Sequence, residues 1–428
     1  MFVADPLFGP ILTPPRFDQM LRTPAVQRLR DVRLINTTTS SLAGLSDIRR
    51  FTHTVGVLHL AARASARLGT AWSSRQLDTL MAALILHDVG TPAYGHLFEY
   101  LLNAEFGFTH EAMARQVITG DHEGAGRFQQ RGRTSLRLRD SLERLDLDPE
   151  EVAAFVLGRS ALGRLVAGSL DFDNLDNVYR MAAGLGLPCH RESLDALAQV
   201  LDVDPDSGRL VLPVSALPDV DQWLRLRRRC YEVIAFDEQA LASQAMLTEC
   251  LSLALERGLL TEADWFRTDE QLLRRLLRLD IGMPLSIRDT MLRFTTGDYF
   301  DTIVIGWYQD SVPAVDLRRA THRAALRASL EERLKMPVFP YVFYDSGTFE
   351  KRLDLLCPAA DGTAVAERMG QTSKSTIVGL FTCERIGPPS QALVTRTEES
   401  LAEFGLVSAT LATQPDRQLV YAPSGKEF

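Results

Sequence analysis

Apolar residues recur at helical spacing along most of the first 300 residues. In Thr54–Leu68 the apolar positions lie three or four residues apart, and Gly69 follows the last of them. That period is typical of one face of an α-helix, and glycine is common just past a helix end. Ser74–Leu86 shows a wider apolar face. The same spacing predicts further helices over Ser135–Leu145, Asp148–Leu157, Asp173–Leu185, Ser193–Ala198, Val220–Leu241 and Ala242–Arg257.

The pattern changes near residue 300. Three short runs of β-branched and aromatic residues bounded by turn residues predict strands over Thr302–Trp307, Val338–Phe343 and Thr376–Thr382. Between the first two runs, Leu317–Leu334 has the spacing of an amphipathic helix. Gly124–Arg133, rich in glycine, glutamine and arginine, is predicted to be a mobile excursion. We therefore expect a mainly α protein, with a helical part over residues 1–300 and a smaller α+β part over residues 301–428.

Composition excludes some classes of function. Hydrophobic residues make up 46% and charged residues 24% of the chain, as in ordinary globular proteins. No apolar run approaches the roughly 18–20 residues that span a bilayer, and the first residues lack a basic signal region. We expect a cytoplasmic protein that does not enter a membrane. The net charge of −8 makes a nucleic-acid partner unlikely, and five scattered cysteines indicate reduced thiols.

Histidine is scarce in the chain, yet it clusters in short motifs. Five of the eight histidines lie between residues 53 and 110. Four of those five lie in RRFTHTVG (Arg49–Gly56), LHDVGTPAYGHLFE (Leu86–Glu99) and FTHE (Phe108–Glu111). A fourth motif, LDFDNLDNVYR (Leu170–Arg180), contains three aspartates. A divalent ion acting on phosphate needs nitrogen and oxygen ligands of this kind, with positions left open for water and substrate.

The placement of these motifs on helices predicts convergence. His87 and Asp88 are adjacent where one predicted helix ends, and His53 lies near the start of another. Asp173 and Asp176 fall on one face of a later helix. Asp171 is also a candidate for capping that helix, the commonest role of an aspartate there. From the residues alone, each of the three aspartates competes for the same ligand position.

The ordered motifs resemble those of the HD-domain phosphohydrolases, specifically the deoxynucleoside triphosphate triphosphohydrolase branch. That branch has an arginine three residues before the histidine of HSLGV, and here Arg50 precedes His53 in HTVGV. Its HDLGHxPFGHxxE is similar to HDVGTPAYGHLFE from His87 to Glu99. The HE pair of that branch corresponds to His110–Glu111 here. Its DxDRxDYLxRD motif is similar to DFDNLDNVYRM from Asp171 to Met181. A looser likeness extends from about residue 27 to residue 247.

The resemblance implies a role for each matching position. The metal ligands would be His53, His87, Asp88 and Asp173, and the ion would be divalent Mn, Fe, Mg, Ni or Zn. The catalytic residues would be His96 with Glu99, and His110 with Glu111, the latter pair as general acid. The residues facing a small nucleotide or phosphoester substrate would be Arg50, Asn174, Asn177 and Tyr231. The products would be a nucleoside and triphosphate, and the resemblance also implies a homo-oligomer.

This chain departs from the family pattern at positions that recognise the substrate in the family. The second histidine of HDLGH is Thr91, and the cation after the metal aspartate is Asn174. The family tyrosine is Asn177, and the aspartate that meets the sugar hydroxyl is Met181. These changes keep two alternatives open: a phosphomonoesterase acting on nucleoside monophosphates or another small phosphoester, and a non-catalytic nucleotide sensor. Arg227–Arg229 are candidate phosphate contacts, although arginine runs more often form a solvated face.

Overall fold

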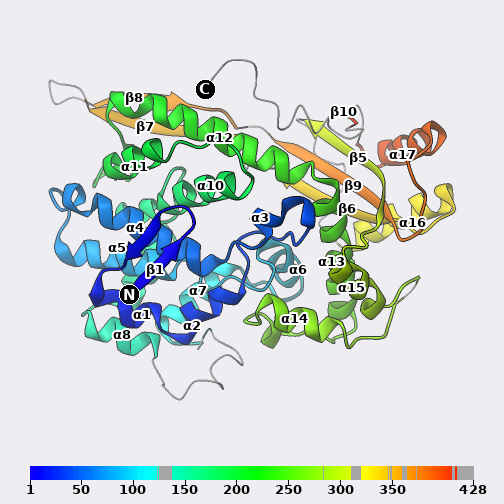
Figure 1. Cartoon of the computed structure of the whole chain (residues 1–428), viewed down its shortest axis with the longest axis horizontal. Coiled ribbons are helices and arrows are strands. Elements are labelled where there is room, and N and C mark those ends of the chain that lie inside the picture. Colours follow the sequence, from blue (N-terminus) through cyan, green and yellow to red (C-terminus); the bar gives the residue numbers. More distant parts are fainter. Residues whose placement is uncertain are drawn as a thin grey trace.

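The computed structural model describes the chain except at residues 123, 125–136, 283, 310–319, 346, 348, 359–363, 373, 407–409 and 412–428. The predicted mobile excursion over Gly124–Arg133 therefore lies, from residue 125 on, outside the described residues. Helices dominate the first 300 residues, and the strands lie mainly near the C-terminus (Figure 1). This confirms a mainly α fold with an α+β C-terminal part.

Three helices supply the candidate site. They are α4 (Arg50–Leu68), α5 (Ser74–Leu86) and α10 (Phe172–Gly184). A capping box starts α5, since the Ser73 side chain accepts from the Gln76 backbone N–H and the Gln76 side chain accepts from the Ser73 backbone N–H. Asp171 caps α10 by accepting from the backbone N–H of Asn174 at 2.6 Å. Asp171 thus has the capping role that the sequence offered as one alternative.

The remaining helices of this part pack around those three or, in the case of α13, α14 and α15, lie to one side of them (Figure 1). They are α1 (Asp18–Leu21), α2 (Pro24–Arg28), α3 (Ala43–Ser46), α6 (His96–Phe106), α7 (His110–Thr119), α8 (Leu138–Arg144), α9 (Pro149–Val156), α11 (Arg191–Val200), α12 (Leu217–Ala235), α13 (Glu238–Glu256), α14 (Asp269–Leu276) and α15 (Ile287–Thr296). A hairpin of β1 (Phe2–Asp5) and β2 (Gly9–Leu12) precedes them.

One predicted helix boundary is wrong. The sequence pattern predicted a break between residues 241 and 242, whereas α12 ends at Ala235 and α13 begins at Glu238. Asp237 decides the break, because its carboxylate accepts from the backbone N–H of Ala240 at 2.7 Å and so caps α13. Apolar spacing continues through both helices and therefore conceals the boundary.

The C-terminal part contains a four-stranded antiparallel sheet. Its order is β10 (Thr410–Leu411), β5 (Asp301–Gln309), β9 (Ser375–Thr382) and β6 (Phe339–Asp345). Every residue of β9 is buried, because the strand is central and both faces of the sheet are covered. Ile377 and Phe381 join the main core, which includes α13, whereas Val378 and Leu380 join a second core with α16 (Ala320–Leu334) and α17 (Gln391–Glu403).

A second sheet combines strands from both parts of the chain. Its order is β3 (Asp202–Val203), β4 (Leu210–Val211), β7 (Leu353–Pro358) and β8 (Ala364–Met369). Strands β4 and β7 are parallel, and the backbone N–H of Leu212 donates to the carbonyl of Leu356 at 3.0 Å. The sequence pattern did not predict β7 or β8. The division of the chain at residue 300 stays a prediction, and this sheet crosses it.

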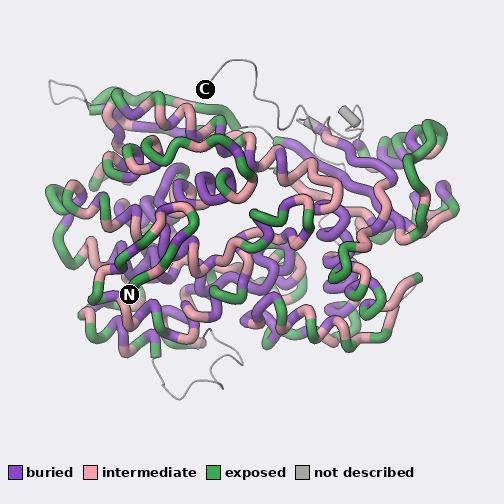
Figure 2. The backbone as a smooth tube through the Cα atoms, viewed as in Figure 1, coloured by how far each residue is buried: buried purple, intermediate pink, exposed green. Residues whose placement is uncertain are grey.

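Buried positions concentrate where α4 packs against α5 and α10, and also along α13 (Figure 2). Leu58 of α4, Leu84 of α5 and Leu175 of α10 are each completely buried in one continuous core. Polar side chains that reach into this packing are therefore held by fixed helices. Among the described residues, no helix is both long and apolar enough to cross a membrane.

Candidate metal centre

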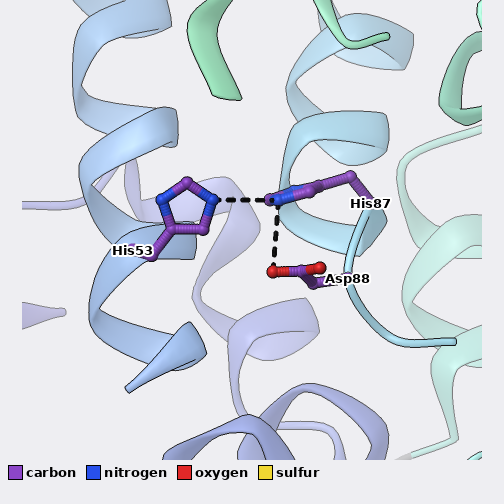
Figure 3. A group of neighbouring side chains, drawn as sticks. All are labelled: His53, His87 and Asp88. Carbon is purple, nitrogen blue, oxygen red and sulfur yellow. Dashed lines mark hydrogen bonds and ion pairs between the residues drawn. The ribbon is translucent and has the colours of Figure 1, made fainter. Parts of the chain in front are cut away.

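The four predicted ligands come together from three helices. His53 lies in the first turn of α4, His87 and Asp88 directly follow α5, and Asp173 lies in the first turn of α10. His53 and His87 face each other edge to face, with ring centroids 5.2 Å apart (Figure 3). Asp88 lies beside His87 in the same view. His53, His87 and Asp88 form a group that can hold a metal ion.

The candidate donor atoms are close to one another. His53 Nε2 lies 3.3 Å from His87 Nε2, and His87 Nε2 lies 3.4 Å from Asp88 Oδ2. Asp173 Oδ1 lies 2.9 Å from His53 Nε2 and 3.9 Å from His87 Nε2. Ligands about 2.1 Å from a shared ion lie roughly 3.0–3.4 Å apart when they are adjacent. The four side chains therefore have nearly the spacing of a coordination shell.

Both imidazoles have the orientation that a metal ligand needs. His87 Nδ1 is 2.8 Å from the carbonyl oxygen of Leu84, and His53 Nδ1 is 2.6 Å from Asp176 Oδ2. Because these acceptors take the Nδ1 hydrogen, Nε2 is the nitrogen left to coordinate an ion. Asp176 itself is clamped by Arg180, whose Nε and Nη2 donate to its two oxygens at 2.7 and 2.8 Å. Asp176 thus orients a predicted ligand.

The charges of the site favour a cation. Burial lowers the pKa of His53, but the hydrogen bonds that Asp173 and Asp176 accept from it outweigh burial and raise the pKa to about 10. Burial likewise opposes the charge of Asp88, yet Arg50 and His87 hold the pKa of that carboxyl well below its usual range. A divalent ion competes with the protons on the imidazoles, so its binding releases protons. The donor set of two nitrogens and two carboxylates fits such an ion.

The two carboxylate oxygens of Asp88 differ in their hydrogen bonds. Oδ1 accepts from Arg50 Nη1 at 2.6 Å and from Thr91 Oγ1 at 2.9 Å. Oδ2 is buried and has no hydrogen-bond partner, so it is the oxygen available to an ion. Thr91, where the family pattern has a histidine, therefore helps to position Asp88. Arg50 also donates to the carbonyl of Leu34, and its buried Nε is unpartnered and available to a phosphate oxygen.

A second cluster contains the predicted catalytic residues. Glu99 Oε2 is 2.8 Å from His96 Nδ1, and Glu99 Oε1 is 2.8 Å from His110 Nδ1. Burial raises the pKa of Glu99, but the two imidazoles outweigh it and lower the pKa far below its usual range. Burial alone would lower the pKa of His110, but the hydrogen bond and charge of Glu99 outweigh burial, so the pKa is raised. Glu111 lies 3.4 Å from His110 Nδ1, so Glu99 is its closer carboxylate partner.

The loop between the two clusters is held in a constrained shape. Tyr94 and Gly95 both have positive φ, 54° and 53°, directly before His96. Asp269 stabilises this turn by accepting from the backbone N–H of Tyr94 at 2.9 Å. Gly90 permits a close approach of α7, because a Cβ there would lie 2.1 Å from the carbonyl oxygen of His110. These contacts position His96 and His110.

Three of the four predicted substrate residues, Asn174, Asn177 and Tyr231, lie on α10 and α12, whereas Arg50 lies on α4. Asn174 Oδ1 accepts from Arg227 Nη1 at 3.0 Å, and Arg227 lies 4.8 Å over the Tyr231 ring. Asn177 Oδ1 is buried and has no hydrogen-bond partner. Lys351, which the sequence analysis did not single out, also reaches Asn174, at 3.4 Å. No local motif marks Lys351, and only the tertiary fold brings it there.

The comparisons with known proteins agree with this geometry. Residues 50–156 match the family model described as HD domain. The chain therefore contains an HD domain and resembles phosphohydrolases of the deoxynucleoside triphosphatase type. The deoxynucleoside triphosphate triphosphohydrolase SAMHD1 homolog of Dictyostelium discoideum is 26% identical over 212 residues, covering 47% of this chain and 40% of the relative.

Other relatives extend the likeness over more of the chain. The protein YwfO of Bacillus subtilis is 22% identical over 360 residues, covering 78% of this chain and 79% of its own length. The MG461 homolog of Mycoplasma pneumoniae is 22% identical over 264 residues, 58% of this chain and 59% of the relative. A phosphohydrolase from Bacteroides thetaiotaomicron has a similar structure, with a TM-score of 0.64 over 90% of this chain and 100% of its own at 17% identity. That likeness shows the fold.

Proposed function

We propose that this protein is a divalent-metal-dependent phosphohydrolase acting on nucleotides, and most specifically a deoxynucleoside or modified nucleoside triphosphate triphosphohydrolase. The observation that carries the proposal is the convergence of His53 Nε2, His87 Nε2, Asp88 Oδ2 and Asp173 Oδ1. The name of the Dictyostelium relative supports the nucleotide substrate. A homo-oligomer is part of the proposal, and light scattering during size-exclusion chromatography tests it.

The protein side chains divide the work of such a reaction. A divalent ion, when bound by the four ligands, supplies positive charge that polarises a phosphoryl oxygen. Arg50 binds an oxygen of the reacting phosphate through donors that include its unpartnered Nε. Water attacks the α-phosphorus, the bond between phosphorus and the 5′-oxygen breaks, and His110 delivers the proton that the leaving 5′-oxygen needs. Glu99 holds His110 Nδ1, so Nε2 is the atom that carries that proton.

A phosphomonoesterase acting on nucleoside monophosphates is the second candidate. It is favoured by the absence of a cation at Asn174 itself and by Met181, which is buried in the core where the family has a sugar-binding aspartate. The third candidate, a non-catalytic sensor, is disfavoured by the complete set of four ligand side chains.

The decisive experiment combines metal analysis with a product screen. Purified protein is analysed for bound metal and then incubated with Mn²⁺ and dNTPs, NTPs or nucleoside monophosphates. Triphosphate together with nucleoside supports the proposal, whereas orthophosphate from monophosphates supports the second candidate. Bound metal without turnover on any of these favours the sensor, and protein that binds no divalent ion contradicts both hydrolase candidates.

A double variant tests the ligand assignment. His87→Ala with Asp88→Ala should lose both bound metal and hydrolysis, because it removes two of the four donors. His59→Ala is the matched control, since His59 packs against Phe8 and lies outside the site. Retained stoichiometric metal in the double variant would contradict the assignment.

A further inference from the structure

We propose that Lys351, together with Arg227 of α12, forms a cationic subsite for the phosphate groups of the substrate that are not attacked. The inference rests on the proposed function and deepens it, because it names residues that select a polyphosphate. It also assigns a task to Lys351, which lies two residues before β7. The two cations would replace the one that position 174 lacks.

Asn174 is the point on which the two cations meet. Its Oδ1 accepts from Arg227 Nη1 at 3.0 Å and lies 3.4 Å from Lys351 Nζ. Its Nδ2 donates to both oxygens of Asp171, at 2.9 and 3.0 Å. The amide is therefore held with its oxygen toward the cations. Asn174 follows the predicted ligand Asp173 directly, so this pair of cations lies beside the metal centre.

Among the described residues, both cations retain donors that no hydrogen bond uses. Arg227 is only 5% exposed, and its Nε is buried without a hydrogen-bond partner. A buried guanidinium with an unused donor is costly unless a ligand satisfies it. Besides Asn174, Lys351 Nζ contacts the carbonyl oxygen of Gly168 at 3.3 Å. Both of these partners are neutral and distant, so the ammonium is free to bind an anion more closely.

Neutralisation of Asp171 alone does not account for Lys351. The Asp171 carboxylate already accepts from the backbone N–H groups of Gly168 and Asn174, each at 2.6 Å, and from the Asn174 side chain. Within the described part of the chain, the hydrogen bonds of Lys351 go to Gly168 and Asn174 and not to Asp171. Burial lowers the pKa of Lys351 and the charge of Asp171 opposes that shift, so a bound polyanion would further stabilise the protonated amine.

The segment that carries Lys351 is anchored on α12. Phe349 is buried, and its ring centroid lies 6.3 Å from that of Tyr231. Glu350 accepts from Arg228 Nη1 at 2.6 Å. Tyr231 in turn stacks under Arg227, at 4.8 Å. Three consecutive residues thus contact the site: Phe349 meets Tyr231, Glu350 meets Arg228, and Lys351 meets Asn174.

This arrangement specifies the chemistry of the ligand. A phosphate that binds Arg50 and an ion held by the four ligands would lie between α4, α5 and α10. Lys351 and Arg227 lie instead on the α10–α12 side. A ligand that reaches both needs at least two linked phosphates. Inorganic triphosphate is therefore a sufficient probe, and orthophosphate is the matched probe that cannot span both places.

The test is calorimetric titration of folded wild-type protein, Lys351→Met and Lys374→Met with inorganic triphosphate and with orthophosphate. Lys351→Met should weaken triphosphate binding about tenfold to a hundredfold, the effect of one charge-assisted hydrogen bond, and leave orthophosphate binding unchanged. Lys374 is exposed, so its variant removes the same charge away from the site. Lys351→Arg should retain most of the affinity, and circular dichroism checks the fold of each variant.

The outcomes separate the subsite from the proposed function. If triphosphate binds equally well to wild-type protein and Lys351→Met, or does not bind to wild-type protein, the subsite is refuted even where dNTPs are hydrolysed. Lys351-dependent binding by a protein that hydrolyses no nucleotide would retain the subsite and refute the activity. With an active enzyme, Lys351→Met should raise KM for triphosphate substrates more than it lowers kcat.

Discussion

At the scale of single residues, each predicted histidine of the site is oriented by a second partner. Asp176 binds His53, the Leu84 carbonyl binds His87, and Glu99 binds both His96 and His110. A partner on Nδ1 determines which nitrogen is free and which way the ring faces. The chemistry of the imidazoles therefore depends on the groups that accept the hydrogen of Nδ1.

Removal of the charge of Asp176 should weaken metal binding. Asp176→Asn leaves His53 Nδ1 with a poorer acceptor and Arg180 with Asp5 as its remaining carboxylate partner. We expect metal affinity to fall roughly tenfold to a hundredfold, as measured by competition with a chelator. Asp195→Asn is the control, because Asp195 pairs with Arg63 at the surface. Unchanged affinity in folded Asp176→Asn would contradict the orienting role.

Glu99 should determine the alkaline limit of activity. Because Glu99 raises the pKa of His110, the protonated acid persists above pH 6.5 and is lost as pH rises through the raised value. In Glu99→Gln the carboxylate that raises the pKa of His110 is gone, while burial still lowers that pKa. The alkaline limb of the pH profile of kcat/KM should therefore move to lower pH. Glu111→Gln should cause a smaller shift, because Glu111 is farther from Nδ1 and 47% exposed. An unmoved limb in Glu99→Gln would exclude His110 as the acid.

At the scale of secondary-structure elements, small residues let the helices of the site approach closely. A Cβ on Gly56 of α4 would lie 2.0 Å from Asp176 Oδ1 and 2.3 Å from Arg180 Nη2. Gly44 and Gly184 make a similar contact between α3 and α10, where a Cβ on Gly44 would lie 2.4 Å from the Gly184 oxygen. These contacts place the carboxylates of α10 within reach of the histidine of α4.

Gly56→Ala should destabilise the protein although it improves helix propensity. The exchange of glycine for alanine inside a helix adds up to about 1 kcal/mol. Here, however, the methyl group displaces a buried ion pair, and we expect a net loss of roughly 2–4 kcal/mol in the free energy of unfolding by urea. Gly69→Ala, at the end of the same helix with a nearest contact of 3.2 Å, should change stability by less than about 1 kcal/mol. Equal stability of the two variants would contradict the packing argument.

At the scale of the whole molecule, the C-terminal part is joined to the helical part in two ways. Strand β7 extends the sheet begun by β3 and β4, and the sheet containing β9 covers α13, where Tyr341 donates to Gln244 Oε1 at 2.8 Å. Both contacts remove apolar surface from water across the predicted boundary at residue 300.

The shared core predicts one cooperative unfolding transition. Differential scanning calorimetry of the full chain should show a single transition, because loss of either part exposes apolar surface of the other. Two transitions of separate midpoint would instead support independent domains divided near residue 300.

Local signals explain which elements the sequence predicted. The helix predicted over Ser74–Leu86 from its apolar face has the bounds of α5, and in the structure a capping box starts it. The strand Thr376–Thr382 differs from β9 by one residue. The boundary between α12 and α13 was wrong, because uninterrupted apolar spacing conceals an aspartate cap. Strands β7 and β8 were not predicted; β8 is an edge strand and mostly exposed, so it carries little apolar pattern, whereas β7 lies between β4 and β8.

The sequence by itself determined the helical character of the chain and the motifs that hold His53, His87, Asp88 and Asp173, because these signals lie within a few residues of one another. Only the tertiary structure decided that Asp176 orients His53, that Glu99 joins two histidines, and that Lys351 reaches Asn174. The last contact joins residues 177 positions apart. No local period encodes such a contact, because it exists only once the strands and helices between the two residues have packed into one core.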